Sequence, residues 1–412
     1  MLCVALNAST AWSAAAVDVD PLADPPSPAF AGQTQAPAPT SPSQFRVDTL
    51  IADLASPRAI VPLEGDKLLV VEGSGRVRVL GADGSISDPL TGLPPMLAVG
   101  GRSLHDLVLD THFETTRRVY LTFLAPAADQ QAGARSADDR AAVLAQGKPF
   151  QLDQLASAVL SEDLRGFEDV QILADLWGRR LLSAPDGSLY VSMMAFDSTF
   201  FERRDLAQDP TSLRGKTLRL SADGKAAPGN PFVGTQMRAE AFTVGHRDPD
   251  GLALHPTTGE VWQIEHGPMG GDELNVLRAG KNYGWPLVSY GKNYDGTSIG
   301  PSAAESVEQP RYYWYPSLAI SGLTFYTGDL FPEWKNNVFL GAMSATQGKF
   351  LVRLVLDGDT VVSEERLLKD RDRRVRAVTQ GSDGALYVLT DSENNAQQGR
   401  VFPGEVLRLS PR

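Results

Sequence analysis

The chain has 412 residues and a formal net charge of −12, with 42% hydrophobic and 21% charged residues. This acidic balance argues against a nucleic-acid-binding surface and a basic membrane patch, because both require clustered Lys and Arg. The single cysteine, Cys3, leaves no internal disulfide and no thiolate metal site to expect. Gly and Pro, with 38 and 28 copies, indicate many turns and favour a β protein.

The first 18 residues, MLCVALNASTAWSAAAVD, are similar to the apolar centre and small-residue end of a secretory signal, without its positive opening. A disordered tail is the alternative. Residues 19–45 are rich in Pro, Ala and Ser and predict a disordered linker. No other stretch is long and apolar enough to span a membrane. We therefore expect a periplasmic or secreted protein.

From about residue 46, a turn followed by an alternating apolar run recurs six times. The runs lie at 64–72, 112–123, 185–193, 257–265, 331–343 and 382–390. Charged second strands are expected at 75–84, 216–224, 349–358 and 405–412, where Arg or Lys alternates with Val or Leu. Six such units predict an all-β protein, a six-bladed β-propeller over residues 46–412. A pair of β-sandwiches is the alternative.

One segment breaks this pattern. Residues 125–148 are rich in Ala, Gln and charge, without β-branched runs, and predict a partly helical surface insertion. Propellers bind ligands on the central axis, where the inner strands and loops of all blades converge. Site residues are therefore expected from many parts of the chain.

The stretch 245–286 is the densest in site-forming residues. It holds three of the five histidines, an arginine in a Gly-His-Arg turn, a Gly-Pro corner and an acidic pair, Asp272 and Glu273. The histidines are nine and eleven residues apart, which fits no short metal motif, so structural roles are expected. The acidic pair binds a second ion or caps the next turn.

Several segments occur in one order along the chain, including GHRDPDGLALHP, EHGPMGGDELN, PSLAISGLTFYTGDLFP and RVRAVTQGSDGALYVLTD. With these, the chain resembles the soluble sugar dehydrogenases that use pyrroloquinoline quinone (PQQ), in their aldose sugar dehydrogenase branch. The resemblance covers residues 46–412. It implies a six-bladed propeller that holds PQQ and a calcium ion over its axis and oxidises a small sugar or alcohol. The resemblance leaves the electron acceptor unknown.

The resemblance also implies a calcium site at the backbone carbonyls of Gly267 and Pro268. Calcium takes oxygen ligands, including main-chain carbonyls, so a tight Gly-Pro turn is a suitable donor. An ordinary strand-ending turn is the alternative, because Gly and Pro dominate such turns.

Cofactor binding is implied for Arg247, Asp248, Arg374 and Arg376. Arginine suits the three carboxylates of PQQ because its planar fork donates two parallel hydrogen bonds. Arg374 and Arg376 alternate on one strand, so both side chains are expected to share a face. A solvated charged strand is the alternative.

The chain departs from the family at the catalytic base. The position of the usual histidine is Leu176, and leucine has no basic atom; Asp175 or Asp250 is the expected replacement. Asp248 and Asp250 also stand where the family has amides. Ionised carboxylates only accept hydrogen bonds and would repel a tricarboxylate.

Two further departures concern contacts with the ligands. A cofactor-contacting lysine on the fifth blade has no clear counterpart, and Gly101 stands at the position of a sugar-contacting glutamine. Two interpretations follow. Either the site is a rebuilt dehydrogenase, or a non-redox propeller binds a sugar, lactone or protein partner through the same cleft.

Overall fold

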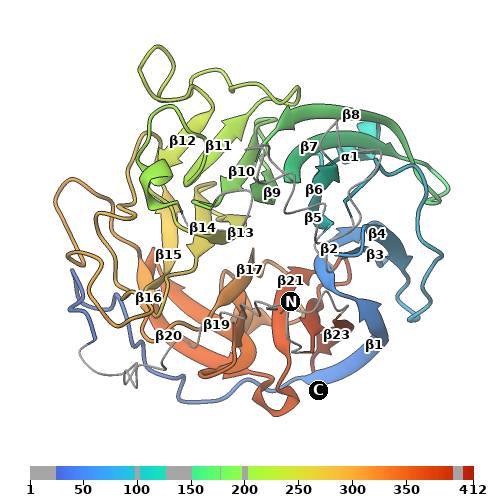
Figure 1. Ribbon diagram of the computed structural model, residues 1–412. Helices are drawn as coiled ribbons and strands as arrows, with labels where there is room; N and C mark the ends of the chain where they lie inside the picture. The colour runs from blue at the N-terminus through green and yellow to red at the C-terminus, as the bar shows by residue number, and fades with distance from the viewer. Residues whose placement is uncertain (1–24, 98–102, 127–150, 177, 197–202, 393–401) are drawn as a thin grey trace, which may run out of the picture.

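Six antiparallel sheets surround a central axis (Figure 1). This computed structural model describes residues 25–97, 103–126, 151–176, 178–196, 203–392 and 402–412. Five sheets have four strands and one has three. The arrangement confirms the predicted six-bladed β-propeller and excludes the pair of sandwiches.

The strands run outward from the axis in each blade. In this order the blades are β2 (Pro57–Leu63), β3 (Lys67–Glu72) and β4 (Arg76–Leu80); β5 (Leu104–Leu109), β6 (Arg118–Pro126), β7 (Gln151–Leu160) and β8 (Phe167–Asp175); β9 (Gly178–Ser183), β10 (Leu189–Met193), β11 (Lys216–Leu220) and β12 (Ala241–Val244); β13 (Pro249–Leu254), β14 (Val261–Glu265), β15 (Asp272–Leu277) and β16 (Tyr312–Trp314); β17 (Ile320–Phe325), β18 (Val338–Ser344), β19 (Gly348–Asp357) and β20 (Thr360–Leu367); and β21 (Arg374–Gln380), β22 (Leu386–Asp391), β23 (Pro403–Ser410) and β1 (Arg46–Ala55). The short helices of the described chain are α1 (Phe113–Thr116) and the 3₁₀ turns Arg204–Ala207, Pro332–Trp334 and Lys369–Arg371.

The last blade is built from both ends of the described chain. Its outermost strand, β1, pairs antiparallel with β23, with Arg46 opposite Ser410 and Ala55 opposite Pro403. The ring is therefore closed by backbone hydrogen bonds between the N-terminal and C-terminal parts of the propeller.

Each of the six predicted apolar runs overlaps the second strand of a blade, and each of the four charged runs overlaps a third strand. The second strands lie between two neighbouring sheets and are buried on both faces; β10 and β14 are buried throughout. The core lies between adjacent blades, as where Trp262 and Ile264 of β14 pack in one cluster with Leu340 and Val352 of the next blade. Burying such side chains contributes about 25 cal/mol per Å².

Residues 25–45 differ from the disordered linker expected at 19–45. They form no helix or strand, but Gln33 is fully buried. Its side-chain amide donates to the backbone carbonyl of Pro310 (2.9 Å). Its backbone carbonyl accepts from the backbone N–H of Tyr313 (2.9 Å). Pro37 accepts from the N–H of Glu364 (3.1 Å). The segment is held because neighbouring strands satisfy its backbone polar groups.

Some predictions fall on residues that the structure does not describe. Residues 1–24 lie outside the described part, as do residues 127–148 of the expected insertion; residues 125 and 126 belong to β6. Within the described ranges, no helix has the length and apolar character needed to cross a membrane.

Candidate functional site

The six inner strands share a local irregularity. Each of β2, β5, β9, β13, β17 and β21 has one more residue than its partner strand at one point of the ladder. Such a bulge redirects a side chain out of the regular alternation of a strand. The bulged residues are Arg58, His105, Arg179 with Arg180, Asp250, Gly322 and Arg376.

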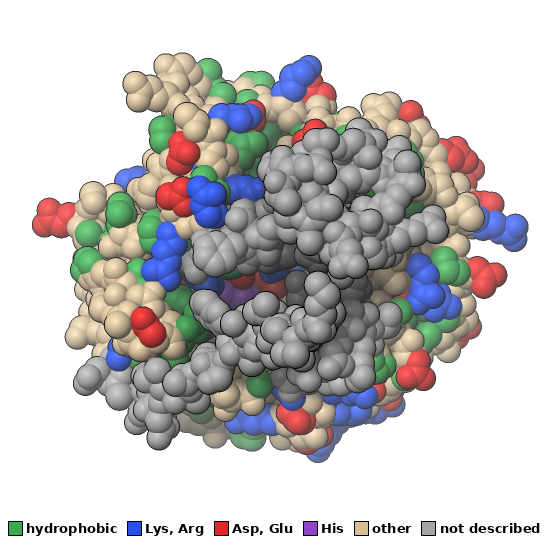
Figure 2. Space-filling model, viewed as in Figure 1, with side chains coloured by type: hydrophobic (Ala, Val, Ile, Leu, Met, Phe, Trp, Pro, Cys, Tyr) green, Lys and Arg blue, Asp and Glu red, His purple; other side chains and the backbone are tan. Residues whose placement is uncertain are grey.

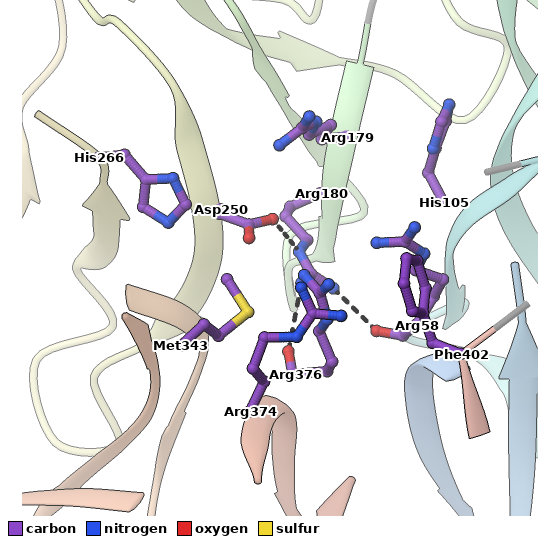
Figure 3. A pocket seen from close by; sticks show the side chains of 10 residues that line it. All are labelled: Arg58, His105, Arg179, Arg180, Asp250, His266, Met343, Arg374, Arg376 and Phe402. Carbon is purple, nitrogen blue, oxygen red and sulfur yellow. Dashed lines mark hydrogen bonds and ion pairs between the residues drawn. The ribbon is translucent and has the colours of Figure 1, made fainter. Parts of the chain in front are cut away.

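All of these residues except Gly322 line one pocket on the axis, together with His266, Met343, Arg374 and Phe402 (Figure 3). In Figure 2, charged side chains and a histidine are visible at the bottom of the central hollow of this face. The bulges thus bring together chemically active side chains from five blades.

Arg180 lies at the floor of the pocket, where it makes hydrogen bonds to four neighbouring residues. Its guanidinium donates to Asp250 (Nε to Oδ1, 3.0 Å), to the hydroxyl of Ser321 (3.1 Å) and to the carbonyls of Arg58 (3.3 Å) and Arg376 (3.4 Å). These partners belong to β13, β17, β2 and β21, while Arg180 itself belongs to β9. One side chain therefore joins five inner strands.

Two buried carboxylates surround this guanidinium. Burial raises the pKa of Asp106, on β5, to about 6, although the charge of Arg180 opposes the shift. Burial would also raise the pKa of Asp250, but the positive charge of Arg180 outweighs it and lowers that pKa. Asp250 is therefore an ionised, ion-paired carboxylate, which is a weak proton acceptor.

Asp248 is compensated by two cations. Its carboxylate lies 3.3 Å from Nη1 of Arg179 and 3.5 Å from Nδ1 of His266. Burial would raise the pKa of Asp248, but Arg179 and His266 together lower it. Burial would lower the pKa of His266, but Asp248 raises it to about 9. The repulsion of an anionic ligand expected from Asp248 is thus offset.

Arg374 and Arg376 lie on one side of β21 and both reach the pocket (Figure 3). Their Nε atoms donate to the two oxygens of Asp391, at 2.7 and 2.8 Å. Asp391 is almost fully buried. This shared carboxylate fixes the orientation of both guanidinium groups, and Phe402 packs against that of Arg374 at 5.0 Å.

Arg247 does not line the axial pocket. It faces an adjacent small cavity, on which Gly267 also borders. Its backbone N–H donates to Glu265 (2.7 Å), and its guanidinium lies over the rings of Trp285 (5.4 Å) and Phe196 (5.5 Å). The predicted set of three cofactor arginines is therefore divided between two cavities.

The Gly267–Pro268 turn joins β14 to β15. The backbone at Gly267 lies so close to that of Gly270 that a Cβ on Gly267 would overlap the carbonyl oxygen of Gly270. Asp272 accepts from the N–H of Gly267 (3.0 Å) and the hydroxyl of Ser317 (2.7 Å), so it caps the turn.

No backbone N–H of the described residues donates to the carbonyl oxygen of Gly267 or Pro268. The described residues also contain no cluster of three or more His, Cys, Asp or Glu side chains suited to a metal ion. Backbone carbonyls are therefore the oxygen donors that this turn offers to a cation.

Asp175 and Leu176 lie away from the pocket. Asp175 is exposed on β8, the outermost strand of its blade, and accepts from the amide of Gln154 (2.8 Å). Leu176 is 7% exposed and packs in an apolar cluster with Tyr120 and Leu155. Neither residue lines the axial pocket, so the structure gives no support for Asp175 as a base there.

The sequence analysis missed the pocket residues Arg58, His105, Arg179 and Arg180, which lie at bulges. It also missed Met343 and Phe402, and it expected only a structural role for His266. The blades were predicted from the apolar pattern of their second and third strands. An extra residue in the inner strand does not change that pattern. Gly101, which stands at the position of the family's sugar-contacting glutamine, lies outside the described residues.

The fold and the site define a six-bladed propeller with a cationic axial pocket. Residues 54–401 match the family described as Glucose / Sorbosone dehydrogenase, and the chain belongs to this family. It is 34% identical over 385 residues to the aldose sugar dehydrogenase YliI of Escherichia coli, covering 90% of this chain and 94% of the relative.

Solved structures agree with this membership. The apo-form of the soluble aldose sugar dehydrogenase of Escherichia coli has a TM-score of 0.76 and 32% identity, covering 89% of this chain and 100% of the other. The PQQ-bound aldose sugar dehydrogenase of Streptomyces coelicolor has a TM-score of 0.64 and 22% identity, covering 90% and 99%, and shows a shared fold.

Proposed function

We propose that this protein oxidises an aldose or a related alcohol in the axial pocket, with PQQ as the oxidant and calcium at the Gly267–Pro268 turn. Family membership supports the reaction class. The observation that carries the proposal is the pair Arg374 and Arg376, which present two oriented guanidinium groups to the same cavity.

The pocket residues fit the proposed cofactor. PQQ carries three carboxylates, and arginine binds carboxylates through two parallel hydrogen bonds. Arg58 and Arg179 add further positive charge to the pocket, while Asp248 and Asp250 are each paired with an arginine. When bound, the quinone supplies the acceptor for the hydride that leaves the alcohol carbon.

The chain's own groups then have distinct tasks. Arg374 and Arg376 bind and orient the anionic ligand, because Asp391 fixes both side chains. Arg180 closes the floor of the pocket through its ion pair with Asp250. The carbonyls of Gly267 and Pro268 would hold calcium close to His266.

The test is quinone binding in the presence of calcium, followed by absorbance, and reduction of a dye with aldoses. Arg374→Gln should weaken quinone binding by about tenfold or more, since each charge-assisted hydrogen bond contributes about 1.5–3 kcal/mol. Arg371→Gln is the matched control, because Arg371 is exposed on the 3₁₀ turn next to β21.

Equal affinity in both variants would contradict the role of Arg374. If the unaltered protein neither bound the quinone nor reduced dye, the proposed function would be wrong. A rise in melting temperature with sugars or lactones, without quinone, would then favour the non-redox interpretation, because a ligand of the folded state stabilises it.

A further inference from the structure

The axial pocket contains one imidazole to which neither the sequence nor the proposed mechanism has given a role, that of His105. We propose that His105 is the catalytic base, which accepts the proton of the substrate hydroxyl, and that Asp153 is its positioning residue. This inference rests on the proposed function and names the proton acceptor that Leu176 cannot provide.

His105 is placed for this task by the backbone. It is the extra residue in the bulge of β5, opposite the pair Phe123 and Thr122 of β6, and it lines the axial pocket. In Figure 3 it lies on the side of the pocket opposite His266, with Arg179 between them. Its side chain is 12% exposed, so a ligand in the pocket can reach it while most of the ring is buried.

A buried carboxylate orients the ring. Nε2 of His105 lies 3.3 Å from Oδ1 of Asp153, on β7, whose side chain is 2% exposed. With the Nε2–H donated to Asp153, Nδ1 carries the lone pair. No hydrogen bond joins Nδ1 to another described residue. A histidine held by a carboxylate, with its second nitrogen toward a ligand cavity, is a geometry suited to general-base catalysis.

The other candidates in the pocket are poor proton acceptors. His266 has Asp248 beside Nδ1 and the carbonyl of Ile320 beside Nε2, so both nitrogens face acceptors and the ring is held as a cation. Asp250 is engaged by Arg180. The other groups with charge that line the pocket with His105 are arginines, namely Arg58, Arg179, Arg180, Arg374 and Arg376.

Asp153 also contacts the residue at the position where the base was expected. The backbone carbonyl of Asp153 accepts from the N–H of Leu176 (2.8 Å). The carboxylate of the same Asp153 holds His105. Asp153 therefore links the imidazole, which comes from β5, to the residue at position 176.

The proposed step balances. The substrate O–H bond breaks and its proton forms a bond to Nδ1 of His105, while hydride passes from the alcohol carbon to the quinone. The alcohol becomes a carbonyl compound, the quinone gains two electrons and one proton, and the imidazolium later releases its proton to solvent. Asp153 stabilises the imidazolium by its charge.

The first experiment uses the full chain loaded with PQQ and calcium. His105→Gln should lower kcat by about 10²- to 10⁴-fold, the usual contribution of a general base, with unchanged quinone affinity by absorbance. Added imidazole should partly restore turnover to His105→Ala. His112→Gln is the matched control, because His112 also lies near an aspartate (Asp110, 3.6 Å) but is 67% exposed and outside the pocket.

The second experiment needs no cofactor. The tautomer of the His105 imidazole is measured by nitrogen NMR in the unloaded protein and in Asp153→Ala. The Nε2–H form should predominate in the parent protein, because Asp153 accepts that hydrogen, and this preference should be lost when the carboxylate is removed.

The outcomes separate the two proposals. Active parent protein together with near-parental kcat in His105→Gln, or no rescue by imidazole, overturns the role of His105 and leaves the dehydrogenase function in place. An unchanged tautomer of His105 in Asp153→Ala overturns the positioning role. A parent protein that binds no quinone and oxidises no aldose overturns the function and, with it, the catalytic role of His105.

Discussion

At the scale of single residues, the acidic substitutions in the Gly-His-Arg-Asp-Pro-Asp stretch are compensated by neighbours on β9. Asp248 lies against Arg179, and Asp250 lies against Arg180. Consecutive residues on an ordinary strand point to opposite faces, but the bulge lets both arginines turn toward the axis. The two added negative charges are therefore matched by two positive charges within the same pocket.

The pH dependence of the free energy of unfolding should reveal the raised pKa of Asp106. Its pKa is raised from 3.8 to about 6 by burial, so the folded state binds its proton more tightly than the unfolded state. The associated stability is present below pH 3.8 and is lost as the pH rises to about 6, amounting to about 3 kcal/mol. Urea unfolding at pH 4 and pH 7 measures the total pH dependence, to which other buried carboxyls with a raised pKa, such as Asp272, also contribute.

Asp106→Asn removes that titration and serves as the comparison. Its free energy of unfolding, relative to that of the parent, should become more favourable by about 3 kcal/mol between pH 4 and pH 7. The same difference at both pH values would show that the pKa of Asp106 is not raised. Asp248 does not interfere, because its lowered pKa places its titration below this window.

Site residues were predictable from the sequence where they belong to a segment that resembles the family. Arg374 and Arg376 were placed on one face, and both line the pocket, although Arg376 is the extra residue of a bulge. Arg58 and His105 are also extra residues of bulges, and no quoted segment drew attention to them. Asp175 and Leu176 were misplaced because the chain passes there from the outermost strand of one blade to the innermost strand of the next.

At the scale of elements, the second strand of each blade was predictable from its turn and its apolar run. The expected alternation of buried and exposed positions is absent from β10 and β14, because both faces of these strands are buried between sheets. The segment 25–45 was not predictable, because its Pro-rich composition also describes a free linker. What fixes it is a set of distant partners, among them Pro310 and Tyr313, which no local pattern shows.

Gln33→Ala should release this segment. Buried Gln33 bonds to Pro310, Ala29 and Tyr290, and its removal deletes all three bonds, including the one to the buried carbonyl of Pro310. The expected loss is about 2 kcal/mol in the free energy of unfolding, with faster proteolysis of residues 25–45. Gln44→Ala, at an exposed side chain of the same segment, should change stability by less than about 0.5 kcal/mol. Similar losses in both variants would contradict the anchoring role.

At the scale of the whole molecule, Arg180 connects the blades at the axis. Its hydrogen-bond partners lie on four other inner strands, and both side chains of its ion pair with Asp250 are largely buried. Each blade also packs against its neighbours through its own apolar cluster, so the axis adds polar connections to a ring already held by its core.

Arg180→Met should destabilise the protein by about 3–5 kcal/mol, because it leaves Asp250 and Asp106 as uncompensated buried carboxylates. Chemical unfolding measures the loss. Arg165→Met, at a side chain that is 86% exposed, is the control and should be nearly neutral. A small effect of Arg180→Met would mean that water or rearranged side chains replace the guanidinium.

The closure of the ring through β1 and β23 bears on the order in which the protein is made. Arg374 and Arg376 belong to β21, the inner strand of the same sheet. That sheet needs β1, which is synthesised early, and β23, which ends at Ser410. During synthesis, β1 therefore waits as an unpaired edge while five blades are translated, and such edges invite aggregation. The ligand pocket becomes complete only when the last blade forms, so a nascent chain that lacks β23 holds neither the closed ring nor the finished site.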